Sequence, residues 1–125
     1  MSKAKVLIIE DEKPLREVYE IILSNAGYAV ETAVNGQEGL EALAHNEPDF
    51  VLLDVFMPVM NGVEFMRALA PEKRASIAIV VFSNNSDTGV RDDMINLGAK
   101  KVILKADLTP DGLVQMVGKY LPPWK

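Results

Sequence analysis

Charged side chains stand at the ends of three short apolar runs of this chain, and their types suggest phosphoryl chemistry. The run 6–9 leads into Glu10 and Asp11, the run 50–53 into Asp54, and the run 102–104 into Lys105. If these runs are neighbouring parallel strands, three carboxylates and one ammonium meet at one edge of a sheet. Magnesium prefers hard oxygen ligands and keeps several waters, so two or three carboxylates suffice to hold it. An aspartate can attack phosphorus and carry an acyl phosphate, while cations neutralise the transferring oxygens.

Composition excludes several classes of protein. The 125 residues suit a single domain, and the formal charge of -5 with no basic block beyond Lys100-Lys101 argues against nucleic acid binding. The absence of cysteine excludes disulfides and thiolate chemistry. No apolar stretch approaches the roughly 20 residues that span a membrane, and the amino terminus lacks a signal-peptide pattern. We therefore expect a cytoplasmic protein without membrane contact.

Short apolar runs alternate with amphipathic stretches along the chain, which is typical of parallel strands joined by crossover helices. We expect strands at 5–9, 29–32, 50–53, 77–82 and 102–104, each followed by a helix. Leu15, Val18 and Ile22 mark the apolar face of the first helix, which Pro14 can open and Gly27 can close. Five strand–helix units account for the chain, so we expect an α/β domain over residues 1–121 and a short tail at 122–125.

The combination of charged and small residues resembles the receiver domain of bacterial two-component response regulators. The resemblance covers roughly the whole chain and rests on Glu10-Asp11, on Asp54 with Met57-Pro58 and Gly62, on Ser83, and on Lys105. It implies a flavodoxin-like (βα)5 fold, a doubly wound sandwich around a five-stranded parallel sheet in the order 2-1-3-4-5.

The resemblance also implies a role for each residue of the combination. Asp54 would be the phosphoacceptor, and Mg2+ would be bound by Glu10, Asp11, Asp54 and the backbone carbonyl of Phe56. Ser83 would hydrogen-bond the phosphoryl group, and Lys105 would pair with it. The only catalysis expected is the chain's own phosphoryl transfer and the hydrolysis of its aspartyl phosphate.

Partners follow from the same resemblance. A histidine kinase or a phosphotransfer protein would donate the phosphoryl group, and the message would pass to a separate downstream protein that the sequence does not identify. No output domain is expected after Lys125, and a stand-alone regulator and a receiver cut from a larger protein both fit the sequence. We expect a monomer or a weak dimer.

Three positions depart from the common family pattern around the site. The residue three before Lys105 is usually aromatic and is Val102 here, which puts the usual coupling in doubt. The residue after Ser83 is usually small and is Asn84 here. The residue after Lys105 is usually a cis proline and is Ala106 here, so we expect a trans bond.

Further expectations concern the loops near the site. Thr109 or Asp107 is expected to cap the last helix. Phe56 and Asn85 occupy the positions that tune acyl phosphate hydrolysis in the family. Since a phenyl ring cannot hold an attacking water by hydrogen bonding, we expect a long-lived phosphoryl group.

Other interpretations stay open at this point. Ser83 fits a helix-capping role as well as a phosphoryl contact. A phosphatase of the haloacid dehalogenase type would need Asp-x-Asp at the strand end, whereas Asp54 is followed by Val55-Phe56, and the chain has no spare residues for a cap. A receiver-fold scaffold or interaction module with weakened phosphorylation coupling is the remaining alternative.

Overall fold

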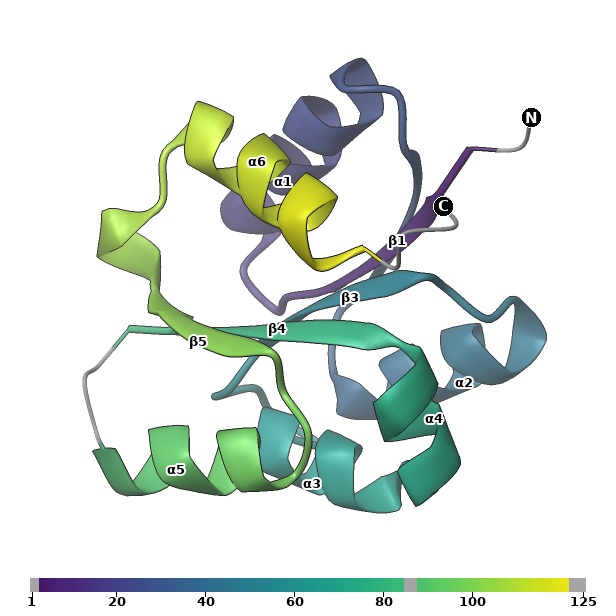
Figure 1. Cartoon of the computed structure of the whole chain (residues 1–125), viewed down its shortest axis with the longest axis vertical. Coiled ribbons are helices and arrows are strands. Elements are labelled where there is room, and N and C mark those ends of the chain that lie inside the picture. The colour runs from purple at the N-terminus through teal and green to yellow at the C-terminus, as the bar shows by residue number, and fades with distance from the viewer. Residues whose placement is uncertain (1–2, 85–87, 122–125) are drawn as a thin grey trace.

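A five-stranded parallel sheet runs through the middle of the molecule in the computed structural model, which describes residues 3–84 and 88–121 (Figure 1). The strands are β1 (Lys5–Ile9), β2 (Ala29–Ala33), β3 (Phe50–Asp54), β4 (Ala78–Ser83) and β5 (Lys101–Leu104). Their spatial order is β2-β1-β3-β4-β5 with every pair parallel, which confirms the flavodoxin-like arrangement. Asp54 and Ser83 are the last residues of their strands rather than the residues that follow them.

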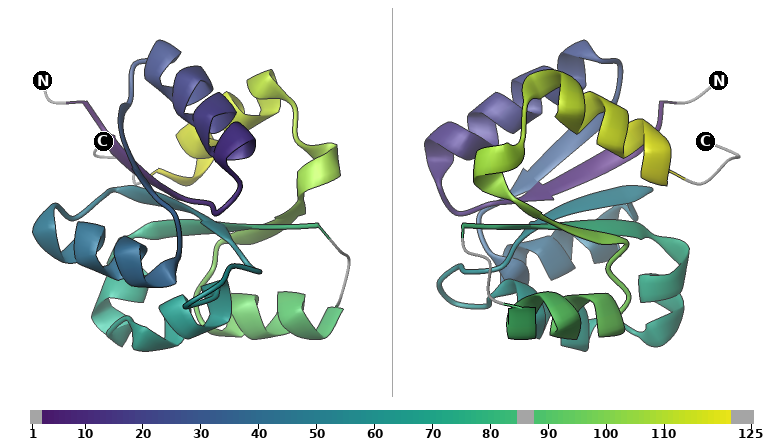
Figure 2. Two further views of the ribbon diagram at one scale, coloured as in Figure 1. Left: turned by 180° about the vertical axis from the view of Figure 1, so that it is seen from behind. Right: turned by 60° about the vertical axis from the view of Figure 1, so that its left-hand side comes forward.

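Helices cover both faces of this sheet (Figures 1 and 2). One layer contains α1 (Lys13–Asn25) and α6 (Pro110–Tyr120), and the other contains α2 (Gly36–His45), α3 (Gly62–Ala68), α4 (Pro71–Ser76) and α5 (Thr88–Asn96). Alternate residues of β1 join opposite cores: Val6 and Ile8 pack under the first layer, while Leu7 and Ile9 pack under the second. Burial on both faces explains why the inner strands are almost entirely aliphatic.

Several predicted boundaries of the helices are confirmed. Gly27, with a φ of 102°, follows the end of α1 in a backbone conformation that suits glycine. A reciprocal capping box of Asn61 and Glu64, which was not among the predictions, begins α3. Thr109, rather than Asp107, caps α6, because its hydroxyl accepts a 3.0 Å hydrogen bond from the Gly112 amide.

Two expectations about helices are wrong. Residues 71–76 form α4, which the sequence reading treated as a connection, because a short helix with no buried residue has no apolar periodicity. The strand after it therefore begins at Ala78. On α1, Val18 is 48% exposed, whereas Tyr19 and Leu23 are buried. Leu15 and Ile22 pack against the core as expected, so the buried face includes them together with Tyr19 and Leu23 but leaves Val18 out.

Positions 85–87 and 122–125 lie outside the described residues, so the expectations for Asn85 and for the tail are not addressed by the structure.

Candidate functional site

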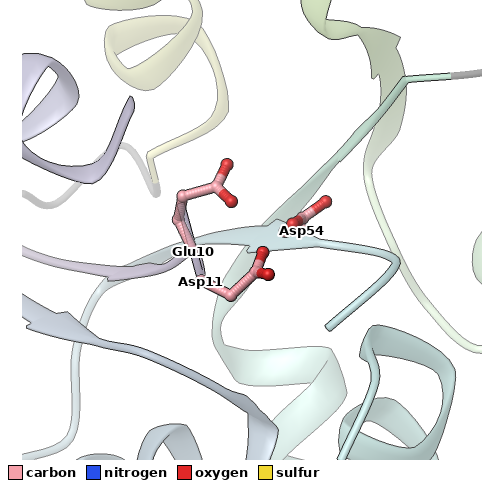
Figure 3. A group of neighbouring side chains, drawn as sticks. All are labelled: Glu10, Asp11 and Asp54. Atoms are coloured by element: carbon pink, nitrogen blue, oxygen red, sulfur yellow. The ribbon is translucent and has the colours of Figure 1, made fainter. Parts of the chain in front are cut away.

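Three carboxylates meet where β1 and β3 end (Figure 3). The two strands are paired with Ile9 opposite Leu53, so the residues that follow, Glu10 and Asp54, also become neighbours. One carboxylate oxygen from each of Glu10, Asp11 and Asp54 lies within 4.8 Å of the others. Glu10 is 1% exposed and Asp54 is 5% exposed, whereas Asp11 is half-buried. The sequence prediction that these acids share one sheet edge is confirmed.

Lys105 supplies the positive charge of this cluster. Its ammonium lies 2.7 Å from Glu10 Oε1 and 3.2 Å from Asp54 Oδ1, and the side chain is 7% exposed. β5 ends at Leu104, and the short 3-10 helix η1 (Lys105–Asp107) starts at the lysine itself. The peptide bond between Lys105 and Ala106 is trans, as expected.

The contact between the lysine and Glu10 is an ion pair between two buried side chains. Within the described part of the chain, neither Lys105 Nζ nor Glu10 Oε1 has any hydrogen-bond partner. Buried polar atoms usually have a hydrogen-bond partner, so an atom without one calls for a physical explanation. The ion pairs with Glu10 and Asp54 are what compensates the buried charge of Lys105.

Burial and crowding change the ionisation of the cluster. Burial, followed by hydrogen bonding to Glu10 and the negative charge of that residue, raises the pKa of Asp54 to about 8. Burial alone would lower the pKa of Lys105, but the nearby carboxylates of Glu10 and Asp54 outweigh it and raise that pKa. Without a bound cation, Asp54 therefore retains a proton near neutral pH, while the lysine stays charged.

The loop after β1 is held on two sides. The amide of Glu10 donates to Ala33 O of β2 at 3.0 Å, and the amide of Glu12 donates to Glu10 Oε2 at 3.2 Å. Arg16 of α1 turns back toward the loop, and its Nη1 donates to the carbonyl of Glu10 at 2.8 Å and to that of Asp11 at 3.3 Å. Arg16 was missed in the sequence, because a contact with backbone carbonyls leaves no pattern of residue types.

The loop after Asp54 depends on close backbone packing. The Gly62 amide donates to Val55 O at 2.8 Å, and a Cβ added at Gly62 would lie 2.6 Å from the carbonyl oxygen of Asp54. Only glycine fits this position without moving the end of β3. Within the loop, Val59 has a φ of 68°, and the amide of Met60 donates to Pro58 O at 2.7 Å, which closes a γ-turn.

The other predicted residues lie around this cluster in different environments. Ser83 is 3% exposed, and it extends β4 one residue beyond Phe82, the residue that pairs with Asp54. Phe56, two residues after Asp54, is 53% exposed. Val102 is half-buried in the core on the α5 side of the sheet.

The arrangement of acids, lysine and strand order has counterparts in known proteins. Residues 6–118 match the family described as the response regulator receiver domain. This chain belongs to that family. Receiver domains of response regulators act in phosphorelay signalling, where they interact with histidine kinases and downstream effectors.

Relatives of this receiver domain include longer proteins. It is 34% identical over 105 residues to the probable transcriptional regulator ycf27 of Porphyridium aerugineum, covering 84% of this chain and 43% of that protein. It is 32% identical over 101 residues to the response regulator ArlR of Staphylococcus aureus, covering 81% of this chain and 45% of that protein. The chain thus spans less than half the length of these relatives.

A solved structure agrees in fold over nearly the whole receiver domain. The chemotaxis protein CheY4 of Vibrio cholerae superposes with a TM-score of 0.88 at 29% identity, covering 96% of this chain and 100% of that chain. Across the described ranges of the receiver domain, none of the helices is long and apolar enough to cross a bilayer.

The donor set of this receiver domain fits a small divalent cation. Carboxylate oxygens are the ligands that Mg2+ prefers, and the three acids leave part of its coordination shell to water and backbone. A bound cation would offset the burial and the neighbouring negative charge that hold a proton on Asp54.

Proposed function

We propose that this receiver domain accepts a phosphoryl group on Asp54 in a reaction that requires Mg2+. The observation that carries the proposal is the meeting of three carboxylates with a buried ammonium 3.2 Å from Asp54 at the carboxyl edge of the sheet. Glu10, Asp11 and Asp54 would hold the cation, together with the backbone carbonyl of Phe56 that the family resemblance implies. When bound, the cation supplies positive charge to the oxygens of the transferring group.

The chain's own residues then have separate tasks. An oxygen of Asp54 attacks phosphorus, the phosphorus–nitrogen bond of the donor phosphohistidine breaks, and the leaving imidazole takes up a proton. The ammonium of Lys105 moves its pairing from the free carboxylate to the new phosphoryl oxygens. The hydroxyl of Ser83 donates a hydrogen bond to one of these oxygens. The buried position of these groups limits access of water during the transfer.

Phosphorylation would then change a surface for protein binding. Lys105 and Ser83 lie at the ends of β5 and β4, so a new pairing there biases the positions of the loops that follow. The surface formed by α5, β5 and α6 is the proposed readout, and it has a hollow of about 240 Å3 between β5 and α6. Lys101, Ile103, Met116 and Tyr120 contribute to its lining.

The finer assignments for the chain are proposals of the same kind. The donor would be a histidine kinase or a phosphotransfer protein, and the receiver would signal to a separate protein as a monomer or weak dimer in the cytoplasm. Residues 1–121 would form the receiver domain and 122–125 a tail. Its catalysis would be limited to its own phosphorylation and to hydrolysis of the aspartyl phosphate.

Intact mass after incubation with acetyl phosphate tests the proposal. With Mg2+ present, we expect the parent protein to gain one phosphoryl group, and we expect no gain after addition of a chelator. Asp54→Asn is the matched control, because it keeps the shape of the side chain and removes the nucleophile. A folded parent that binds Mg2+ but never gains the group would reject phosphoryl acceptance and favour an interaction module.

A further inference from the structure

Arg16 contacts the loop that carries Glu10 and Asp11, and it does so through the backbone of these residues rather than through their carboxylates. It is half-buried on α1, and a single nitrogen, Nη1, donates to the carbonyls of two consecutive residues, Glu10 at 2.8 Å and Asp11 at 3.3 Å. On the other side, the Glu10 amide donates to Ala33 O at 3.0 Å. The peptide groups on both sides of Glu10 and the one after Asp11 are therefore fixed in place.

Fixing these peptide planes sets the directions in which the two acidic side chains leave the backbone. The direction of each Cα–Cβ bond follows from the two peptide planes that flank the residue. One guanidinium holds the carbonyls of Glu10 and Asp11, and the carboxylates that project from this backbone lie near that of Asp54 (Figure 3). The loop has no regular secondary structure that would otherwise fix its carbonyls.

We propose that Arg16 is a positioning residue for the divalent cation. It touches neither cation nor substrate, and it fixes the backbone from which the Glu10 and Asp11 carboxylates project. This inference rests on the proposed function, since it assumes that the acidic cluster holds Mg2+. Mutation of a residue that orients metal ligands typically lowers metal affinity by about 10- to 100-fold.

The direction in which Mg2+ affinity changes when Arg16 is replaced distinguishes a positioning role from a purely electrostatic one. If Arg16 acted only through its positive charge, its removal would make the cluster more negative and Mg2+ would bind more tightly. If Arg16 positions the ligands, its removal weakens Mg2+ binding although the cluster becomes more negative. A role limited to stabilising the fold would leave the Mg2+ affinity of the folded protein unchanged.

Arg74 is a matched control within the same chain. It is also half-buried, and its Nη1 also donates to two backbone carbonyls, Met66 O at 2.9 Å and Leu69 O at 3.0 Å. It lies on α4, which precedes β4 and so lies at the opposite edge of the sheet from the acids (Figure 1). Its loss removes the same charge and the same kind of contact, but it leaves the loop after β1 in place.

The experiment compares Mg2+ affinity by isothermal titration calorimetry in the parent, Arg16→Gln, Arg16→Lys and Arg74→Gln, with thermal unfolding of each. We expect Arg16→Gln to bind Mg2+ roughly tenfold more weakly or worse. We expect Arg74→Gln to keep the Mg2+ affinity of the parent even if its thermal midpoint falls as far as that of Arg16→Gln. Affinity in a folded Arg16→Gln equal to or tighter than that of the parent would overturn the positioning role.

Arg16→Lys keeps the positive charge, and it tests the positioning role of Arg16 if Arg16→Gln does not fold. The shorter cation cannot keep both carbonyl contacts in place, so we expect several-fold weaker Mg2+ binding. Parent-like affinity in that case would overturn the inference. A parent protein that does not bind Mg2+ would reject the proposed function together with this role, whereas a binding parent with unaltered variants rejects the Arg16 role alone.

Discussion

Mg2+ binding should release a proton from the acidic cluster. Burial and the neighbouring Glu10 raise the pKa of Asp54 to about 8 in the metal-free protein. At pH 7, a group with that pKa is roughly nine-tenths protonated. A bound divalent cation favours the ionised carboxylate and lowers this pKa far below neutral. We therefore expect about 0.9 proton to be released per Mg2+ bound at pH 7 and about 0.1 at pH 9.

Calorimetry in two buffers of different ionisation enthalpy measures this number directly. The observed binding enthalpy changes with buffer in proportion to the protons released. The same linkage predicts that Mg2+ affinity rises about tenfold per pH unit below pH 8 and levels off above it. Asp54→Asn cannot carry the proton and should show little dependence on buffer. A parent protein whose binding enthalpy is the same in both buffers at pH 7 would refute the reasoning, because Asp54 would already be ionised.

The raised pKa also determines how the stability of the metal-free protein depends on pH. Between about pH 4 and pH 8, folded Asp54 keeps a proton that the unfolded chain has released. Its contribution to the free energy of unfolding is therefore fully present below the unfolded pKa and is lost as pH rises toward 8. Denaturant unfolding with a chelator present should show this decline in the parent and a weaker one in Asp54→Asn.

Three substitutions near Asp54 test the loops around it. Gly62→Ala adds a Cβ 2.6 Å from the Asp54 carbonyl oxygen, so it should lower the unfolding free energy by about 2 kcal/mol in a denaturant titration. It should also lower the phosphorylation rate. The control Gly118→Ala, at a helical position with ordinary contacts, should not destabilise the fold in the same titration. Val59→Asn should raise the unfolding free energy by about 1 kcal/mol, since asparagine tolerates the φ of 68° better; an unchanged denaturation midpoint would contradict strain at this turn. Phe56→Asn should shorten the lifetime of the phosphorylated protein several-fold in a mass-spectrometric time course, since an amide can hold an attacking water; an unchanged or slower loss would contradict shielding by the ring.

The ends of the apolar runs predict which charged residues lie together in the fold. An apolar run that ends in charge predicts a buried strand whose last side chain reaches the sheet rim, and this logic correctly placed the acids around Asp54 and the ammonium of Lys105. It failed where residue types carry no pattern. Helix α4 (Pro71–Ser76) buries no side chain, and Arg16 acts on carbonyls that every residue possesses. Val18 is exposed although Leu15 and Ile22 pack on the core, because Val18 and Tyr19 lie about 100° apart around α1 and Tyr19 takes the buried side.

The central claim is that Asp54 carries the phosphoryl group, and chemical trapping of the acyl phosphate tests it most directly. The protein is phosphorylated with acetyl phosphate and Mg2+, reduced with borohydride, digested, and sequenced by mass spectrometry. An acyl phosphate is reduced to an alcohol, so the account predicts homoserine at position 54 and unmodified Glu10 and Asp11. Reduction at any other carboxylate, or none in a protein that has gained the phosphoryl mass, would contradict the account.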